Sequence, residues 1–325
     1  MDKEITQKPL AKLTTNMWAF RTLVASIKLD VFEYIKEDST AEEVAKKLNI
    51  NVNPVERLLN ALVAMDLVEK RGRSYVNLPI SNKFLIKNLP SYYGDFILMA
   101  EDSDDSWKEL DKSIVSSEAT TDDQNERLAK PFFTRAMHNN AQDPARKLSK
   151  SFDFSEKKHL LDIGAGAGTF SIVLTNEYPD LRATTIEQKN VCKIIDEYIK
   201  KEGDAEKIKV VVGDFFEVDF PKHDIALFGQ IFHSNSVEEN KKLLRKVYNN
   251  IENNGMVIIT EFLMNEEKTG PLFSALFSLN MLKQNENGDT YTFSQIKEWL
   301  VEIGFKDIQM EHLTGPHTTI IGYKK

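Results

Sequence analysis

Residues 160–170, LLDIGAGAGTF, decide the fold of this chain. The first four residues read as a short buried strand, and Gly164, Gly166 and Gly168 then turn the chain into a helix. Glycine is needed at such a turn when a ligand lies against the backbone, because any Cβ would block it. We therefore predict a ligand-binding turn, with a buried turn that holds no ligand as the alternative.

The residues around this turn indicate a ligand without phosphates. The glycine spacing is GxGxG, and Thr169 stands where the pyrophosphate-binding pattern GxGxxG has its third glycine. Asp162 directly precedes the turn, and its carboxylate would repel a pyrophosphate. The same carboxylate suits a ligand that carries an ammonium group and a sulfonium.

Two further acidic residues come at the ends of the next two apolar runs. Glu187 ends the run ATTIE, where its carboxylate can accept hydrogen bonds from both hydroxyls of a ribose. Asp214 follows the run KIKVVV, where it can accept from an adenine amino group while Phe215 lies against the ring. With the glycine turn, these residues predict an adenosyl site. A solvated charge at a strand end is the alternative for Glu187.

The sequence after residue 158 alternates short apolar runs with helical segments. Strands that are buried on both faces give such runs, and helical crossovers between them imply a parallel, doubly wound sheet. The last two runs are separated by the short link of residues 314–317, which leaves no room for a crossover helix, so the last strand should be antiparallel. The fold class is thus α/β, Rossmann-like, with strands near residues 159–164, 183–188, 207–214, 223–230, 255–262, 307–313 and 318–325.

One histidine lies where open sheets place their reacting groups. His233 comes just after the fourth run, and Glu261 ends the fifth. A histidine there can take a proton from a hydroxyl, and a carboxylate can hold the imidazole in the correct tautomer. A structural histidine and a hydrated carboxylate are the alternatives. The remaining histidines are assigned to surface or packing roles: His138, His159, His223, His312 and His317.

The first ninety residues have the pattern of a winged helix. Leu13, Met17, Phe20, Val24 and Ile27 recur at spacings of four and three, which makes one apolar stripe on a helix. Two more helical segments follow, and LVEKRGRSYVNL reads as a hairpin that turns at residues 71–72. We predict a winged-helix domain over residues 1–100, connecting helices over 101–150 and a catalytic domain over 151–325.

Composition restricts the partners and the compartment. The chain has 325 residues and a formal net charge of −8, which disfavours nucleic acid as the main partner. A single cysteine, Cys192, cannot form an internal disulfide. Residues 1–13 lack the apolar core of a signal peptide, and no apolar run approaches the roughly 20 residues of a membrane span. We predict a cytoplasmic protein without membrane contact and without a bound metal.

Taken together, these residues resemble the class I S-adenosylmethionine-dependent methyltransferases of the caffeate, chalcone and hydroxyneurosporene O-methyltransferase type, including bacterial relatives in pigment and antibiotic pathways. The resemblance covers nearly the whole chain. It rests on the winged-helix half and on an ordered set of residues: Phe133 and Met137 in FTRAM, the glycine turn, Glu187 with Val191, Asp214-Phe215, His233, Glu261 and the IGF of residues 303–305.

The resemblance implies a function in secondary metabolism. S-adenosylmethionine would give its methyl group to a small molecule, an aromatic or polyketide-like hydroxyl, leaving S-adenosylhomocysteine. His233 would be the base and Glu261 its orienting acid. Gly229 and Gln230 would join the cofactor site, and the N-terminal domain would form a homodimer whose helix lines the partner's substrate pocket, with packing on its own core as the alternative. Candidate pocket residues between the domains are Phe133, Met137, Asn280 and Met281.

The sequence departs from the family pattern at four places. Ser234-Asn235 follow the histidine where Asp-Trp is usual, and Gly229 stands where a lysine commonly touches the cofactor. Phe293, in YTFSQIKEW, aligns with a second acid, and Ala165 and Ala167 replace glycine and a polar residue in the turn.

These departures keep other functions open. They are methylation of carbon, nitrogen or sulfur, and a hydroxylase or decarboxylase that binds the cofactor without transferring its methyl group. A winged-helix DNA-binding regulator is a remote alternative, because residues 54–65, PVERLLNALVAM, have the composition of a buried helix rather than of one that reads a groove.

Overall fold

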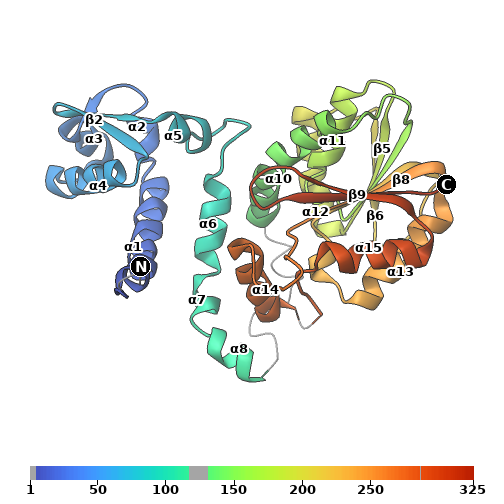
Figure 1. Cartoon of the computed structure of the whole chain (residues 1–325). Coiled ribbons are helices and arrows are strands. Elements are labelled where there is room, and N and C mark those ends of the chain that lie inside the picture. The colour runs from blue at the N-terminus through green and yellow to red at the C-terminus, as the bar shows by residue number, and fades with distance from the viewer. Residues whose placement is uncertain (1–4, 117–130, 286) are drawn as a thin grey trace. The chain divides into compact units, whose positions relative to one another are not determined.

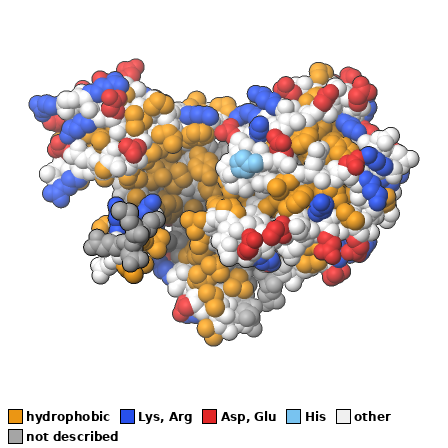
Figure 2. Space-filling view, in the orientation of Figure 1, with side chains coloured by type: hydrophobic (Ala, Val, Ile, Leu, Met, Phe, Trp, Pro, Cys, Tyr) orange, Lys and Arg blue, Asp and Glu red, His pale blue; other side chains and the backbone are white. Residues whose placement is uncertain are grey.

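The computed structural model describes residues 5–116, 131–285 and 287–325. The chain forms two compact units, Met1–Glu101 and Asp102–Lys325. Within the described ranges no helix combines the length and apolar character that crossing a membrane requires. On the face that Figure 2 shows, lysine and arginine side chains are interspersed with aspartate and glutamate over both units.

The first unit is a set of helices with a small antiparallel sheet in the strand order β1-β3-β2. The predicted hairpin is confirmed: its two strands pair from Val68↔Asn77 to Arg71↔Ser74, around Gly72. The elements are α1 (Lys8–Lys28), α2 (Val31–Tyr34), β1 (Ser39–Thr40), α3 (Ala41–Leu48), α4 (Val52–Ala64), β2 (Val68–Arg71), β3 (Ser74–Asn77), α5 (Pro79–Phe84) and α6 (Gly94–Asp102), whose last residue belongs to the second unit.

The apolar stripe of α1 has two different environments. Its second half packs inward, since Val24 and Ile27 are buried in the core of this unit. Its first half does not, because Leu13 is 68% exposed and Met17 is 59% exposed. Packing on the domain's own core therefore accounts for only half of the stripe, and the other half lacks a cover within this chain's described residues.

The helix α4 is also amphipathic rather than buried all round. Val55, Leu59 and Leu62 point into the core of the first unit. Another face carries Glu56 and Asn60, which are both exposed and both contact Lys70 of the neighbouring strand β2. Lys70 Nζ donates to Asn60 Oδ1 at 3.1 Å and lies 3.8 Å from Glu56 Oε1.

The second unit is built on a seven-stranded sheet in the order β6-β5-β4-β7-β8-β10-β9. The first five strands along the chain are parallel, and β10 runs antiparallel to both β8 and β9, so the predicted α/β fold with an antiparallel last strand is confirmed. The strands are β4 (His159–Ile163), β5 (Arg182–Glu187), β6 (Ile208–Val212), β7 (His223–Gly229), β8 (Ile251–Glu261), β9 (Lys306–His312) and β10 (Thr318–Tyr323).

Helices cover both faces of this sheet (Figure 1). One layer packs in a core that includes Leu148, Ile172 and Ile195, and the other in a core that includes Leu243 and Trp299. The first layer is α10 (Pro131–Ser151), α11 (Thr169–Glu177) and α12 (Lys189–Glu202), and the second is α13 (Val237–Asn250) and α15 (Phe293–Ile303). The unit also contains α7 (Asp104–Trp107), α8 (Leu110–Ser116), the 3-10 turn η1 (Phe232–Ser234) and α14 (Leu272–Gln284).

This topology positions the candidate site. The crossover from β4 to β5 passes through α11 on one face, and the crossover from β7 to β8 passes through α13 on the other. Because β4 and β7 are neighbours, their carboxyl ends flank the point where the winding changes direction, which is where open α/β sheets bind ligands. The glycine turn follows β4, and the segment that carries His233 follows β7.

Candidate active site

The glycine turn is held against the next strand by backbone hydrogen bonds. Gly164, Gly166 and Gly168 have φ of 67°, 56° and 73°, the left-handed region that glycine enters most readily. The amide of Gly164 donates to the carbonyl of Ile186 at 3.0 Å, and the amide of Gly168 closes the turn on Ala165 at 2.8 Å. The turn therefore has one fixed shape, directly beside the end of β5.

Glu187 joins this turn through its side chain. Its two carboxylate oxygens accept hydrogen bonds from the amides of Gly166, at 2.8 Å, and Gln188, at 2.7 Å. Burial raises the pKa of this carboxyl above its ordinary value. A buried carboxylate placed at a strand end, with lone pairs left on both oxygens, can accept from a polar ligand that lies along the turn.

Space and apolar contact are both present along the turn. A Cβ at Gly166 would meet no atom within 4 Å, whereas one at Gly164 would lie 2.4 Å from Ile231 and 3.5 Å from the Phe215 ring. Ile231 and Phe215 thus border the turn at Gly164, and the region over Gly166 is open. A ligand that combines a polar part with an apolar ring matches such surroundings.

Gln230 supplies the observation that points most directly to a bound ligand. It adopts a φ of 63°, and its side-chain amide nitrogen is buried without a hydrogen-bond partner among the described residues. Leaving a buried N–H without an acceptor costs roughly 1–3 kcal/mol of stability, so a ligand that accepts from this amide would be stabilised there. The open turn, the carboxylate and the unpaired amide together fit an adenosyl-amino acid.

His233, in η1 just after β7, pairs with the buried Glu261 at the end of β8. The imidazole Nδ1 lies 2.9 Å from Glu261 Oε2, and the two side chains are 12% and 4% exposed. Glu261 also accepts from the backbone amides of His233 and Phe262, each at 3.2 Å. Because the carboxylate only accepts, Nδ1 carries the proton, and Nε2 is left as an acceptor with no partner among the described residues.

Comparison with known proteins decides the family. The O-methyltransferase domain matches residues 107–306, and the O-methyltransferase dimerisation domain matches residues 11–87. The chain belongs to the O-methyltransferase family. It is an S-adenosylmethionine-dependent methyltransferase, and the predicted enzyme class and cofactor are confirmed.

Several relatives of this O-methyltransferase match it over almost their full lengths. It is 30% identical to 3-hydroxy-5-methyl-1-naphthoate 3-O-methyltransferase of Streptomyces sahachiroi, covering 94% of this chain and 92% of that protein. The solved structure of PigF with S-adenosylhomocysteine is 25% identical with a TM-score of 0.84, covering 98% of this chain and 100% of PigF, whose curated sequence is from Serratia sp.. Human N-acetylserotonin methyltransferase shares the fold, with a TM-score of 0.87 at 23% identity, over 100% of this chain and 99% of that one.

The segment after the O-methyltransferase's histidine is held by amides. Asn235 is buried and donates to Asn240 Oδ1 at 3.2 Å, while its carbonyl accepts from the Tyr291 hydroxyl at 2.6 Å. Asn240 in turn donates to the carbonyl of Phe232 at 2.9 Å. Residues on both sides of His233 are thereby fixed to α13 and to Tyr291, which lies just before α15. Asn235, at the family's usual Asp-Trp position, therefore has a structural role here.

The other departures also have local explanations. A Cβ at Gly229 would lie 3.2 Å from the Phe170 ring, which leaves little room for a longer side chain at that position. Phe293 begins α15 and packs against the core of that face, with Lys297 Nζ 5.7 Å from its ring centre. Within the described part of the chain, Glu261 is the one carboxylate that pairs with His233.

Aromatic side chains border His233. The Phe277 ring meets the imidazole edge-to-face at 4.9 Å between centres, and Phe262 lies 6.0 Å away in a stacked orientation. Phe273 contacts both phenylalanines, at 5.0 Å and 5.8 Å. These residues could not be singled out from the sequence, because a phenylalanine pattern on a helix indicates packing as readily as a pocket.

The four predicted pocket residues are distributed over two helices. Met281, on α14, is buried and lies close to Gly288, since a Cβ there would be 3.3 Å from it. The next residue, Asp289, donates its backbone amide to the carbonyl of His233 at 3.0 Å. Asn280 accepts from Gln284 of the same helix at 2.9 Å. Phe133 and Met137 are half-buried on α10 and remain pocket candidates.

The loop that carries Asp214 and Phe215 has a cation beneath it. Asp214 is exposed, and its Oδ1 accepts from the amide of Phe216 at 2.8 Å. Lys246, on α13, donates to the carbonyls of Phe215 and Phe216 at 2.9 Å and 3.2 Å, and burial lowers the pKa of its ammonium group. Sequence reasoning missed Lys246 because a single lysine on an amphipathic helix carries no signal of such a contact.

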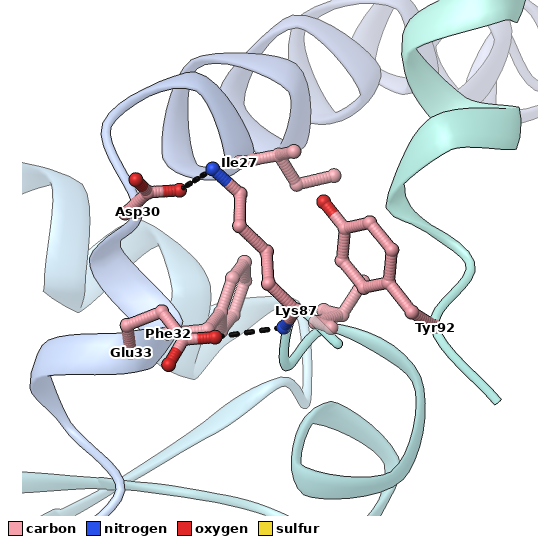
Figure 3. Close-up of a pocket in the computed structure, with 7 residues that line it drawn as sticks. Ile27, Asp30, Phe32, Glu33, Lys87 and Tyr92 are labelled. Carbon is pink, nitrogen blue, oxygen red and sulfur yellow. Dashed lines mark hydrogen bonds and ion pairs between the residues drawn. The ribbon is translucent and has the colours of Figure 1, made fainter. Parts of the chain in front are cut away.

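A hollow lies in the first unit, and Figure 3 shows the side chains that line it. Lys87 extends between α1 and α2, its Nζ pairs with Asp30, and its backbone amide donates to Glu33 Oε1 at 2.7 Å. Tyr92 and Ile27 close the apolar side. The charged groups of this hollow are paired by the chain itself, so it is not the candidate active site.

Asp162 makes the stability of the ligand-free protein depend on pH. It is buried, accepts from Ser171 Oγ at 2.7 Å, and burial raises its pKa from 3.8 to about 7. The folded protein therefore keeps a proton that the unfolded chain has lost, and this group's contribution to stability falls as pH rises from about 4 to about 7.

We expect the stability of Asp162→Asn relative to the native protein to rise by roughly 3 kcal/mol between pH 4.5 and pH 8, because only the native protein carries the buried carboxyl that loses its proton. Thermal unfolding of the two proteins without ligand, compared across this range, is the measurement. The difference between them cancels the titration of other groups, such as His223 and His317, whose pKa values burial lowers to about 4. A difference that does not change with pH would contradict the assignment.

Proposed function

We propose that this O-methyltransferase transfers a methyl group to an aromatic hydroxyl of a small molecule, with His233 as the general base. The observation that carries the proposal is the pairing of His233 with the buried Glu261. Its Nδ1 is held at 2.9 Å by the carboxylate, and its Nε2 is left as an acceptor beside aromatic rings. A base needs this combination of a fixed tautomer and a free nitrogen.

The donor side of the site is assigned to the glycine turn and its neighbours. S-adenosylmethionine supplies an electrophilic methyl group when it is bound. Glu187 would accept from the ribose hydroxyls, Asp214 from the adenine amino group, and Phe215 would lie against the adenine ring. Gln230 would give its unpaired amide hydrogens to a polar atom of the ligand, which would remove the cost of burying them.

On the acceptor side, His233 moves one proton. The acceptor hydroxyl would lose its proton to Nε2 of His233 as its oxygen bonds to the methyl carbon, and the methyl–sulfur bond of the donor would break to leave S-adenosylhomocysteine. The imidazole is then a cation, and the buried carboxylate of Glu261 stabilises that charge through Nδ1–H. A positioned base typically contributes about 10²–10⁴-fold to the rate, and alignment of the reacting atoms contributes further.

The surroundings of His233 support an aromatic acceptor. Phe262, Phe273 and Phe277 form a continuous group of rings next to the imidazole. Aromatic pairs prefer offset or edge-to-face contacts that add about 0.5–1.5 kcal/mol beyond the buried area. The relative from Streptomyces sahachiroi methylates a hydroxynaphthoate according to its name, which agrees with this class of acceptor.

The decisive experiment offers the protein labelled S-adenosylmethionine with separate panels of phenols, carboxylates, amines, thiols and carbon acids. Label should move to phenols, with S-adenosylhomocysteine formed in equal amount. Transfer to amines, thiols or carbon acids instead would establish one of the alternative acceptors. Cofactor bound with no transfer to any panel would favour an enzyme that binds it without methylation.

The first unit is proposed to form a homodimer through the N-terminal half of α1. The matched dimerisation domain spans residues 11–87, and the exposed apolar side chains of the helix lie at its beginning. These side chains are Leu10, Leu13, Met17 and Trp18. A helix face of this kind, left uncovered by the residues that the structure describes, is typical of an interface between subunits.

Replacing both Leu13 and Met17 by aspartate should raise the dissociation constant of the dimer by at least about 100-fold, because two charges would enter an apolar contact. Since both side chains are exposed, the unfolding midpoint of the monomer should change little. Light scattering across a dilution series measures the effect. Ile50→Asp is the control, since Ile50 is 46% exposed in the same unit but lies outside α1. A variant that stays dimeric would contradict this interface.

A further inference from the structure

A second histidine of the catalytic unit, His138, lies next to the glycine turn and has no part in the proposed reaction. It is only 2% exposed and sits on α10, the helix that packs against α11 and α12. Its ring stacks on Tyr198 of α12, with 3.7 Å between ring centres and 25° between planes. A polar ring buried this completely must have its nitrogens satisfied, and the contacts show how.

The side of the ring that carries Nε2 is set by Gln142, one turn further along α10. Arg146 donates to Gln142 Oε1 at 2.7 Å, which fixes the orientation of the amide. The Gln142 amide nitrogen then donates to His138 Nε2 at 2.7 Å and to Glu202 Oε2 at 3.4 Å. Nε2 is therefore an acceptor, and the ring proton is on Nδ1.

Charged groups surround this arrangement from two helices. Glu202, at the end of α12, has Oε2 3.3 Å from His138 Nε2, and Lys201 pairs with Glu202 Oε1 at 3.2 Å. Arg146, also on α10, contacts Gln142 rather than the imidazole. The element on the Nδ1 side, α11, offers a hydroxyl rather than a charge.

That hydroxyl belongs to Thr169. His138 Nδ1 lies 2.9 Å from Thr169 Oγ1 and donates to it. Thr169 is itself 3% exposed and is the first residue of α11, directly after Gly168. The hydrogen bond thus connects α10 to the residue at which the glycine turn becomes a helix.

We propose that His138 is a positioning residue for the methyl-donor site, acting through Thr169 to hold the end of the glycine turn. The inference rests on the proposed function of that turn. The network of Gln142, Glu202 and Tyr198 orients the imidazole, and the imidazole orients the threonine. Such a residue touches neither reactant, so its loss should change the affinity for the methyl donor and its product far more than the rate of transfer.

Two amide substitutions separate positioning from simple packing. In asparagine the amide nitrogen is bonded to Cγ, as Nδ1 is in histidine, so His138→Asn keeps a donor toward Thr169. In glutamine the nitrogen is one bond further out, near the position of Nε2, so His138→Gln loses that donor. Both variants lose the ring and its stacking on Tyr198, and both should unfold at similar temperatures.

Titration calorimetry with S-adenosylhomocysteine on the full-length native protein and its variants provides the readout. His138→Gln should raise the dissociation constant about three- to tenfold, and His138→Asn should restore most of the native value. Thr169→Val should raise the constant equally in the native background and add nothing to His138→Gln, whereas Thr169→Ser should leave it unchanged. With an acceptor, the KM for S-adenosylmethionine should rise in step while kcat stays within about twofold.

The possible results distinguish a wrong positioning role for His138 from a wrong function for the glycine turn. If the native protein does not bind S-adenosylhomocysteine, the function of the turn is wrong. If the native protein binds it, and His138→Asn and His138→Gln bind equally well or equally badly, the ring serves packing only and the positioning role is overturned. Additive effects of His138→Gln and Thr169→Val would overturn it as well.

Discussion

Replacement of His233 by alanine should lower kcat by about 10²–10⁴-fold and leave the affinity for S-adenosylmethionine nearly unchanged. The reason is geometric. His233 offers Nε2 to the acceptor. The groups assigned to the methyl donor are other residues: the glycine turn after β4, Glu187 at the end of β5 and Gln230 directly after β7. Steady-state kinetics with a phenol that the enzyme accepts, and calorimetry with S-adenosylhomocysteine, measure the two quantities separately.

Glu261→Gln tests whether the carboxylate acts through the imidazole. Glu261 accepts from Nδ1 of His233 and from the backbone amides of His233 and Phe262, so a glutamine NH₂ group would face at least one N–H donor. The ring would lose its fixed tautomer, and kcat should fall by roughly 10–10³-fold.

His312→Ala is the matched control for these variants, because His312 is exposed on β9 of the same unit and should have no effect on kcat. A His233→Ala enzyme with the native kcat would rule out the base. Alignment of the acceptor with the methyl group would then have to account for the reaction without a base.

The positions of the turn, Glu187 and His233 could be predicted because they follow from topology. Parallel strands place their carboxyl ends at one edge of a sheet, so residues just after β4, β5 and β7 must lie near one another. Burial on both faces makes those strands visible as apolar runs in the sequence. The site residues that came from such strand ends needed no knowledge of side-chain packing.

Residues whose role depends on packing between distant helices could not be predicted in this way. His138 and Thr169 are 31 positions apart and meet only because α10 packs on α11. The sequence gives His138 the same appearance as any histidine on an amphipathic helix. The same holds for Phe277, which reaches His233 from α14, and for α1, where one continuous stripe divides between a core and an open face.

The methyl-donor site is expected to be lost when Gly166 is replaced by leucine. Gly166 has a φ of 56°, and a Cβ there would point into open space with no protein atom within 4 Å. If S-adenosylmethionine lies in that space, the leucine side chain must exclude it, and we expect affinity for S-adenosylhomocysteine to fall by at least about 100-fold, equivalent to roughly 2.7 kcal/mol. If the turn is only structural, the added side chain meets nothing and binding is unaffected.

Backbone strain is separated from ligand exclusion by Gly72→Leu. Gly72 has a φ of 61° and an equally open Cβ position, but it lies in the β2–β3 hairpin of the first unit. Each variant should lose about 1–2 kcal/mol of stability from forcing a side chain into the left-handed region, with similar unfolding midpoints. Only Gly166→Leu should lose binding. Equal affinities in the two variants would mean that the open space at the glycine turn does not hold the methyl donor, and the assignment of Glu187 and Gln230 to that ligand would fall with it.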